Sequence, residues 1–157
     1  MWTWSEAAHP HVAVVFAGTN SGLDWCDRLD GAATGVISKV LCVCAATAVA
    51  REVLAREPVV PAAARDALNL VEAWIDEPTA ERFERICETI FPPESVPPLD
   101  PHGVVWCALR TATSTAEGYG EAGWALRSTC SAAFRAGLSA DQLREIAARA
   151  VATRAVA

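Results

Sequence analysis

Residues 34–56 read TGVISKVLCVCAATAVAREVLAR, and this stretch decides the fold. Its apolar residues recur in steps of three and four, which is the spacing of one face of an α-helix. The opposite face is almost as apolar, and a helix that is apolar nearly all round is usually surrounded by other helices. Glu57-Pro58 ends the segment, because a proline disfavours the helical conformation in the residue before it. The apolar positions at helical spacing are Ile37, Val40, Leu41, Cys44, Ala48 and Ala55.

Two thiols, Cys42 and Cys44, lie two residues apart in this predicted helix and raise the question of a metal or redox pair. Side chains two positions apart on a helix point about 200° away from each other, so these sulfur atoms cannot bind one ion or form a disulfide. Cys44 falls on the inner stripe and Cys42 falls off it. Since free cysteine packs like a small apolar residue, we interpret both as packing residues.

The remaining cysteines give no stronger sign of a metal site. We expect all six to be free thiols, as is usual for a protein of the reducing cytosol. Their spacing does not contain the paired C-x2-C units of zinc sites. They are Cys26, Cys42, Cys44, Cys87, Cys107 and Cys130.

Length, composition and charge limit the function classes. The 157 residues suit one domain, which buries roughly two-thirds of the surface of its unfolded chain. Apolar residues make up 52% and charged residues 20%, so disorder of the whole chain is excluded. A formal net charge of -6 argues against nucleic-acid binding, which needs clustered basic side chains, and favours a basic protein partner.

No secretory signal or membrane span is expected from the sequence. The apolar stretch from Val12 to Ala17 is short and follows no positively charged region. The longest apolar run, Val40 to Ala50, is about half of the ~20 residues that a spanning helix needs. We therefore predict a cytoplasmic protein. Of the 13 basic residues only Lys39 is a lysine, a bias that suggests a GC-rich bacterial genome.

Helical patterns continue on both sides of the central segment. Thr79 is a predicted N-cap, Gly137 a predicted C-cap, and Ser139 with Gln142 a capping box that begins the last helix. In the helix before that one, the predicted core residues are Trp124, Leu126, Cys130, Ala133 and Phe134. The predicted helices, besides the central one, cover residues 23–29, 61–76, 79–90, 104–115, 121–136 and 139 onward.

Two segments interrupt the helical pattern. Residues 1–22 are predicted to be irregular or weakly helical, with Val12 to Phe16 as a short strand or the start of a helix and with Trp2 and Trp4 as apolar anchors. Residues 91–103, FPPESVPPLDPHG, hold five prolines and are predicted to be an extended connection. The segments that begin at Gly35 and Gly103 share five of 14 residues, which suggests related helical halves.

These patterns together predict the fold class. We expect an all-α, single-domain helical bundle of five to seven helices over residues 1–157. Neither half is long enough to close a core alone, so the proline-rich connection joins two halves of one domain.

Several polar residues were considered as sites. His9 and His11 could both face a metal, but a third ligand would have to come from Asp24, Cys26 or His102. His102 lies near Cys107, yet the surrounding residues form no recognisable nucleophile motif. Gly118-Tyr119-Gly120 is interpreted as a helix junction, because no basic residue lies within it.

Six carboxylates were also candidates for catalytic or metal-binding roles. They are spaced as for solvated helix faces and helix ends, and common nucleotide-binding, zinc-protease and hydrolase motifs are absent from the sequence. We predict no catalytic, cofactor-binding or metal-binding residue, and the partner-binding face stays open. The carboxylates considered are Asp24, Asp27, Asp30, Glu72, Asp76 and Glu77.

The stretch from Cys44 to Cys87 resembles a segment of the immunity proteins of bacterial polymorphic toxin systems. That segment has a Cys- and Ala-rich helix ending in Val-Leu, a charged turn with proline, and an R-x-A…A-W helix. Beyond it, the chain departs from the family pattern through its Glu-Arg pairs and five prolines. The matching positions are Cys44, Ala45, Val53, Leu54, Arg65, Ala67, Ala73 and Trp74.

The resemblance implies a non-catalytic protein that neutralises a cognate toxin by direct contact, and it transfers no catalytic residue. An acidic surface would suit the basic site of a nuclease toxin. Two other classes stay open. A self-associating adaptor or scaffold would account for Trp2, Trp4, Trp25 and Trp106, which exceed what one small core readily holds. A helical bundle could also bind a small apolar ligand between its helices.

Overall fold

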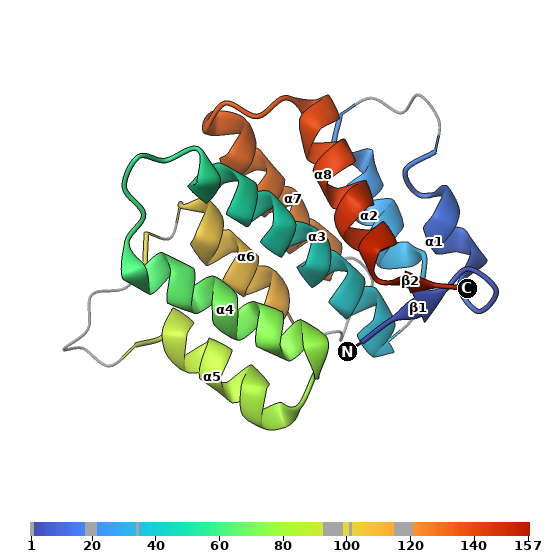
Figure 1. The fold of residues 1–157 in the computed structure, drawn as a ribbon, viewed down its shortest axis with the longest axis horizontal. Helices are drawn as coiled ribbons and strands as arrows, with labels where there is room; N and C mark the ends of the chain where they lie inside the picture. The colour runs from blue at the N-terminus through green and yellow to red at the C-terminus, as the bar shows by residue number, and fades with distance from the viewer. Residues whose placement is uncertain (1, 18–21, 34, 93–98, 101, 115–120) are drawn as a thin grey trace.

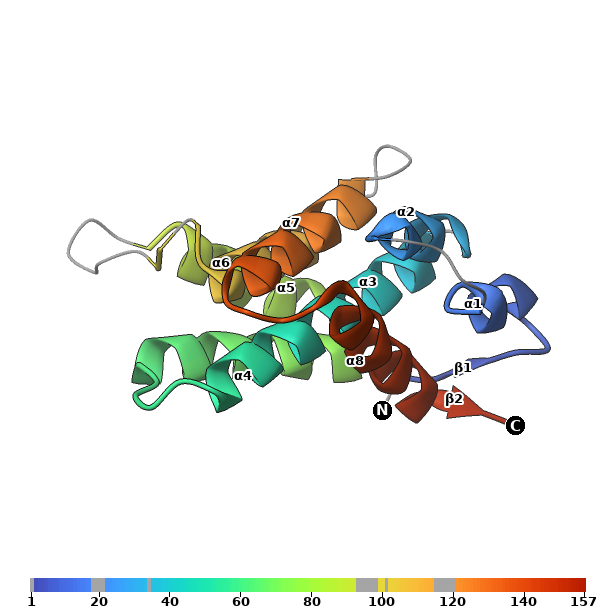
Figure 2. The ribbon, with the colours of Figure 1, turned by 90° about the horizontal axis from the view of Figure 1, so that it is seen from above.

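The computed structural model describes residues 2–17, 22–33, 35–92, 99–100, 102–114 and 121–157. Its centre is α3 (Gly35–Ala55), which packs against helices from both halves of the chain: α2, α4, α6, α7 and α8. Figures 1 and 2 show α3 running through the middle of the molecule. The predicted central helix is therefore confirmed within one residue at each end. Buried residues from both halves form one continuous hydrophobic core.

Both cysteines at the middle of α3 are buried. Cys42 is completely inaccessible and Cys44 is 7% exposed. The prediction that Cys42 lies off the buried stripe is wrong, because α3 is covered on all sides and has no wet face here. Their role as packing residues is confirmed by this burial, and all six cysteines are free thiols.

The N-terminal segment is more regular than predicted. It holds the strand β1 (Trp4–Ser5) and the helix α1 (Pro10–Val14), and α2 (Asp24–Gly31) follows. β1 pairs in parallel with β2 (Ala155–Val156), so the two ends of the chain lie side by side, as Figure 1 shows. The indole Nε1 of Trp4 donates a hydrogen bond to the carbonyl oxygen of Val151 at 2.8 Å. Trp4 is thus a buried anchor, as predicted.

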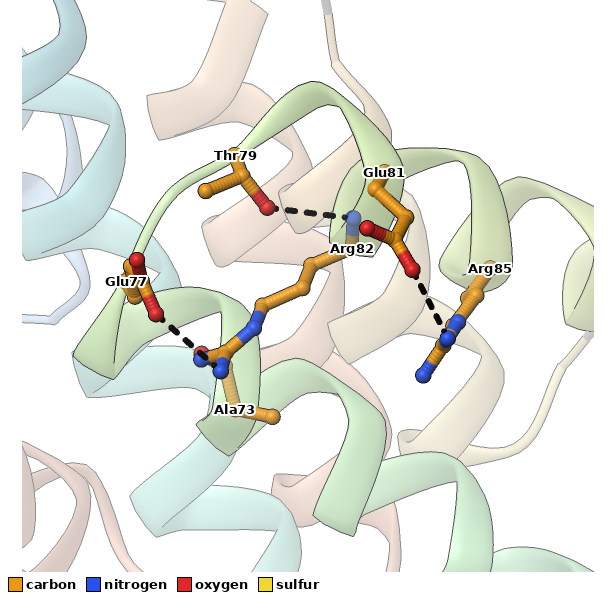
Figure 3. Close-up of polar contacts among 6 residues, drawn as sticks. All are labelled: Ala73, Glu77, Thr79, Glu81, Arg82 and Arg85. Carbon is orange, nitrogen blue, oxygen red and sulfur yellow. Dashed lines mark hydrogen bonds and ion pairs between the residues drawn. The ribbon is translucent and has the colours of Figure 1, made fainter.

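α4 (Ala62–Asp76) and α5 (Ala80–Ile90) form a hairpin on one side of α3. Thr79 caps α5, since its side-chain oxygen accepts a hydrogen bond from the backbone N–H of Arg82. The Arg82 guanidinium donates to the carbonyl oxygen of Ala73 and pairs with Glu77 at 3.1 Å (Figure 3). One arginine therefore satisfies a carbonyl near the end of α4 and fixes the turn into α5.

The second half consists of α6 (Val104–Thr113), α7 (Glu121–Arg135) and α8 (Ala140–Thr153). α6 and α7 pack side by side in opposite directions, as Figure 1 shows. Gly137 has a φ of +107°, which favours glycine, and it ends the turn after α7 as predicted. The capping box of Ser139 and Gln142 is also confirmed.

α7 approaches α2 closely because it carries a glycine at the contact. A Cβ atom on Gly123 would lie 2.9 Å from the Cβ of Asp30 and 3.1 Å from the carbonyl oxygen of Cys26. The Arg127 guanidinium forms ion pairs across the same contact with Asp24 and Asp27. The glycine lets the two backbones approach each other, and the arginine holds their exposed edge together.

The fold class is confirmed as an all-α helical bundle. The residues that the structure describes form eight helices, because α1 adds a five-residue helix to the seven that the sequence patterns predict. In the proline-rich connection, residues 93–98 and 101 lie outside the described part, and the described residues of 91–103 are not helical. The proposed junction at residues 118–120 also lies outside it. None of the helices described combines the length and apolar character needed to cross a membrane.

One part of the predicted core is wrong. Trp124 is 67% exposed and Phe134 is 60% exposed, although Leu126, Cys130 and Ala133 on the same helix are buried. The inner face of α7 is occupied by small and medium side chains that fit closely against α2, α3 and α6. The two large aromatic side chains lie on the opposite side of the helix, where they meet water.

Candidate functional site

The exposed aromatic side chains of α7 locate the candidate site. Scattered apolar residues on a surface are ordinary, but large aromatic side chains beside a hollow are typical of interaction sites. Trp124 is such a case, because it lines a hollow between α6 and α7. Phe134 lies near the other end of the same helix.

α6 supplies one wall of this hollow. His102, Trp106 and Arg110 are four residues apart, so they follow one line along the start and the outer face of the helix. The guanidinium carbon of Arg110 lies 5.6 Å from the ring centre of Trp106, in a cation–π contact. This contact holds Arg110 in a defined place without using its charge in an ion pair.

α7 supplies the other wall. Trp124, Ser128, Ser131 and Arg135 are separated by three or four residues, which places them on one face of the helix. The Ser128 hydroxyl donates to the carbonyl oxygen of Trp124 at 3.2 Å. Each wall therefore combines an aromatic side chain with an arginine.

We call the space between these walls the arginine hollow. Its volume is about 340 Å³, enough for one or two side chains of a partner. Its lining is His102, Trp106, Cys107, Arg110, Trp124, Ala125, Ser128, Ser131 and Arg135.

A second space, the apolar hollow, lies next to the first. It has a volume of about 530 Å³ and is formed by the end of α3, the start of α4, the start of α6 and the end of α7. His102, Trp106 and Arg135 line both hollows, so the two share a wall. Most of its other lining residues are aliphatic: Val53, Leu54, Val59, Pro61, Ala64, Leu99, Val104 and Val105.

The charge of the arginine hollow is opposite to that of the whole chain. Among the described residues that line it there are two arginines and no carboxylate. Neither guanidinium, that of Arg110 nor that of Arg135, forms an ion pair with a residue in the described part of the chain. The carboxylates of the apolar hollow are Glu57 and Asp100, and Asp100 already accepts a hydrogen bond from the backbone N–H of His102 at 3.0 Å.

The arrangement does not favour nucleophilic chemistry. His102 and Cys107 both line the arginine hollow, but no hydrogen bond joins them among the contacts of the described residues. Burial raises the pKa of Cys107, and the positive charge of Arg135 opposes this shift without reversing it. A thiol with a raised pKa stays protonated at neutral pH and is a poor nucleophile.

The two histidines that could together face a metal, His9 and His11, lie at α1, away from α6 and α7. His9 is half-buried at the start of α1, and His11 is exposed in the same short helix. His102, one of the possible third ligands, belongs instead to the hollows at the start of α6. Within the described ranges, no three His, Cys, Asp or Glu side chains gather closely enough to hold a metal ion.

The carboxylates considered in the sequence hold the fold together. Glu72 pairs with Arg51 at 2.8 Å, and Asp76 pairs with Arg154 at 2.7 Å. Asp30 accepts a hydrogen bond from the Ser38 hydroxyl at 2.7 Å. Glu77, Asp24 and Asp27 form the ion pairs with Arg82 and Arg127 described above.

Two groupings were not predicted. The sulfur atoms of Cys26 and Cys130 lie 3.9 Å apart in the core, although 104 residues separate them in the sequence. The hollow itself was also missed, because its residues come from two helices whose pairing the sequence does not state. One feature of the sequence does indicate the hollow: His102, Trp106 and Arg110 are four residues apart, which places polar side chains along one face of a mostly apolar helix.

The chain matches no protein-family model, no curated protein and no solved structure in the comparisons made.

Proposed function

We propose that this chain is a non-catalytic protein-binding domain that holds one partner on the surface of α6 and α7. In its finer form, the proposal is that the partner is a toxin, which the domain neutralises by direct contact. The resemblance of residues 44–87 to immunity proteins motivates the finer form, and the surface supports the general one.

The observation that carries the proposal is the exposed Trp124 beside a hollow lined by Trp106, Arg110 and Arg135. Tryptophan and arginine are among the residue types that contribute most binding energy at protein interfaces. The shape favours a side chain of a partner over an enclosed small molecule, because the hollow is open along the surface between two helices. The neutral thiol of Cys107 gives no support to catalysis there.

The test begins with the purified full chain, tagged and used to capture proteins from a lysate of the source organism. Wild type is compared with Trp124→Ala and with a matched control, Phe91→Ala. Both changes remove an aromatic side chain that is exposed to the same extent, 67% for Trp124 and 68% for Phe91. Only Trp124 lines the arginine hollow.

We expect a captured protein that Trp124→Ala loses and Phe91→Ala retains, and a 1:1 complex when the two purified proteins are mixed. For the finer form, co-expression should restore growth of cells that express the captured protein, and Trp124→Ala should not. Equal capture by wild type and both variants would contradict the proposal. A stable homo-oligomer in light scattering, dispersed by Trp124→Ala, would favour the scaffold class instead. A copurifying small molecule would favour the ligand-binding class.

A further inference from the structure

We infer that the arginine hollow binds a carboxylate of the partner, and that a neighbouring apolar side chain of the same partner segment enters the apolar hollow. This inference rests on the proposed function and specifies the chemistry of the partner. The partner segment is then acidic and apolar at once, with an Asp or Glu side chain next to an aliphatic or aromatic one.

Two arginines of the site form no ion pair within the described part of the chain. Elsewhere in the described part of the chain, arginines such as Arg51, Arg82 and Arg154 each hold a carboxylate. Arg110 and Arg135 share one hollow and have no such partner there. An anion bound in the hollow would be attracted by both guanidinium groups, because opposite charges attract more strongly where water is partly excluded.

Arg110 is also pre-organised. Its guanidinium lies over the Trp106 ring at 5.6 Å, a position that restricts its rotamers before a partner arrives. No hydrogen bond of its N–H donors is used in this cation–π contact, so a carboxylate can still accept hydrogen bonds from the Arg110 guanidinium. Less entropy is then lost on binding than for a freely moving side chain.

The two hollows share a wall. Trp106 and Arg135 line both hollows, so a group bound between the arginines lies next to the aliphatic space of the apolar hollow. A segment that places a carboxylate in one hollow can place its next accessible side chain in the other. Burial of that side chain supplies the apolar part of the binding energy.

The charge of the chain favours a protein over a nucleic acid as the source of the anion. Tryptophan and arginine can also bind single strands by stacking, but such proteins track the backbone with many cations. Here the lining offers two arginines, and the chain carries a net charge of -6 that repels a polyanion. A single carboxylate is repelled far less, because screening limits the reach of distant charges to about 8 Å at physiological salt.

The experiment uses a phage library of random 12-residue peptides, selected on the immobilised full chain. We expect enrichment of peptides with Asp or Glu beside Leu, Ile, Val or Phe. An enriched peptide, labelled with fluorescein, is then titrated with wild type, Arg135→Glu, Arg110→Glu and the control Arg149→Glu by fluorescence anisotropy. Arg149 is exposed on α8 and does not line the hollow, so the control makes the same change of net charge elsewhere.

We expect Arg135→Glu to weaken binding at least tenfold and Arg149→Glu to change it less than twofold. Arg135 is exposed, so its variant should keep the fold even if Arg110→Glu does not, and circular dichroism checks both. Enrichment of basic peptides, absence of enrichment, or equal losses for Arg135→Glu and Arg149→Glu would overturn the inference. Tight binding of a 20-nucleotide single-stranded DNA that depends on Arg135 would also overturn it.

The two proposals fail in different ways. A captured protein that is lost with Trp124→Ala but retained by Arg135→Glu would leave the protein-binding function standing and refute the carboxylate site. A captured protein that binds Trp124→Ala as well as wild type would refute the proposed function itself.

Discussion

The close contact between α2 and α7 allows a quantitative prediction for Gly123→Ala. The added Cβ atom would lie 2.9 Å from the Cβ of Asp30 and 3.1 Å from the carbonyl oxygen of Cys26. The Cys26 oxygen belongs to the backbone of α2, and it cannot move aside without moving that helix. Two helices must therefore separate by a few tenths of an ångström at this point.

Two effects of the substitution oppose each other. Overpacking of a core contact costs about 1–3 kcal/mol. Replacement of glycine by alanine inside a helix returns about 1 kcal/mol, because alanine loses less conformational entropy on folding. Gly31, the last residue of α2, provides the control, since a Cβ atom there would meet nothing within 4 Å. Gly31 is also helical, so Gly31→Ala should gain the same helix benefit without the steric cost.

The free energy of unfolding should therefore be lower for Gly123→Ala than for Gly31→Ala by about 1–3 kcal/mol. For a chain of this length, the melting temperature should differ by about 2–12 °C. Urea and thermal unfolding followed by circular dichroism at 222 nm measure both quantities. Equal stability of the two variants, or a more stable Gly123→Ala, would show that α2 and α7 are not in the close contact described.

Three further predictions concern buried polar and titratable groups. Trp4→Phe keeps an aromatic ring but removes the indole donor to the Val151 carbonyl, which keeps the backbone N–H of Arg154 at 3.2 Å. Urea unfolding should therefore show a loss of about 0.5–1.5 kcal/mol, the net value of one hydrogen bond, which Trp2→Phe should not show. Ellman's reagent should modify one thiol quickly in the native protein, that of the half-buried Cys87. Rapid modification of two thiols, or rapid modification of one thiol in Cys87→Ala, would contradict the packing described. Burial lowers the pKa of Lys39, so the folded state binds fewer protons than the unfolded chain. Between this lowered pKa and the ordinary lysine value near 10.4, the free energy of unfolding of wild type should rise with pH relative to that of Lys39→Met. Urea unfolding at several pH values measures this difference, and a difference that does not change with pH would refute the prediction.

The helices were predictable because their signals are local. Caps such as Thr79 and Ser139, and the stop at Glu57-Pro58, act within one turn of the residues they control. The central position of α3 also followed from its own composition, since a helix without a polar face must be covered by others. These parts of the fold need no knowledge of which helices meet.

Trp124 and Phe134 show where local reasoning fails. Their size and apolar character suggest burial, but α7 presents Gly123, Ala122 and Ala133 to its neighbours and approaches them closely. A bulky side chain on that face would prevent the close approach. Which face of an apolar helix is buried therefore depends on the shape of its neighbours, and the pattern of α7 alone could not decide it.

The charge of the site was unpredictable for a related reason. A net charge of -6 suggests a basic partner, but it averages over carboxylates such as Glu72 and Asp76 that are already held by arginines of the same chain. Their fields are partly cancelled, whereas neither Arg110 nor Arg135 forms an ion pair in the described part of the chain, and the carboxylates Glu57 and Asp100 line the adjoining apolar hollow. Since salt screens charges beyond about 8 Å, the electrostatic energy of a docked partner depends more on these two guanidinium groups than on the net charge of the chain. Raising the salt concentration should therefore weaken a carboxylate partner bound at the arginine hollow, and a complex that tightens with salt would point to repulsion by the rest of the acidic chain.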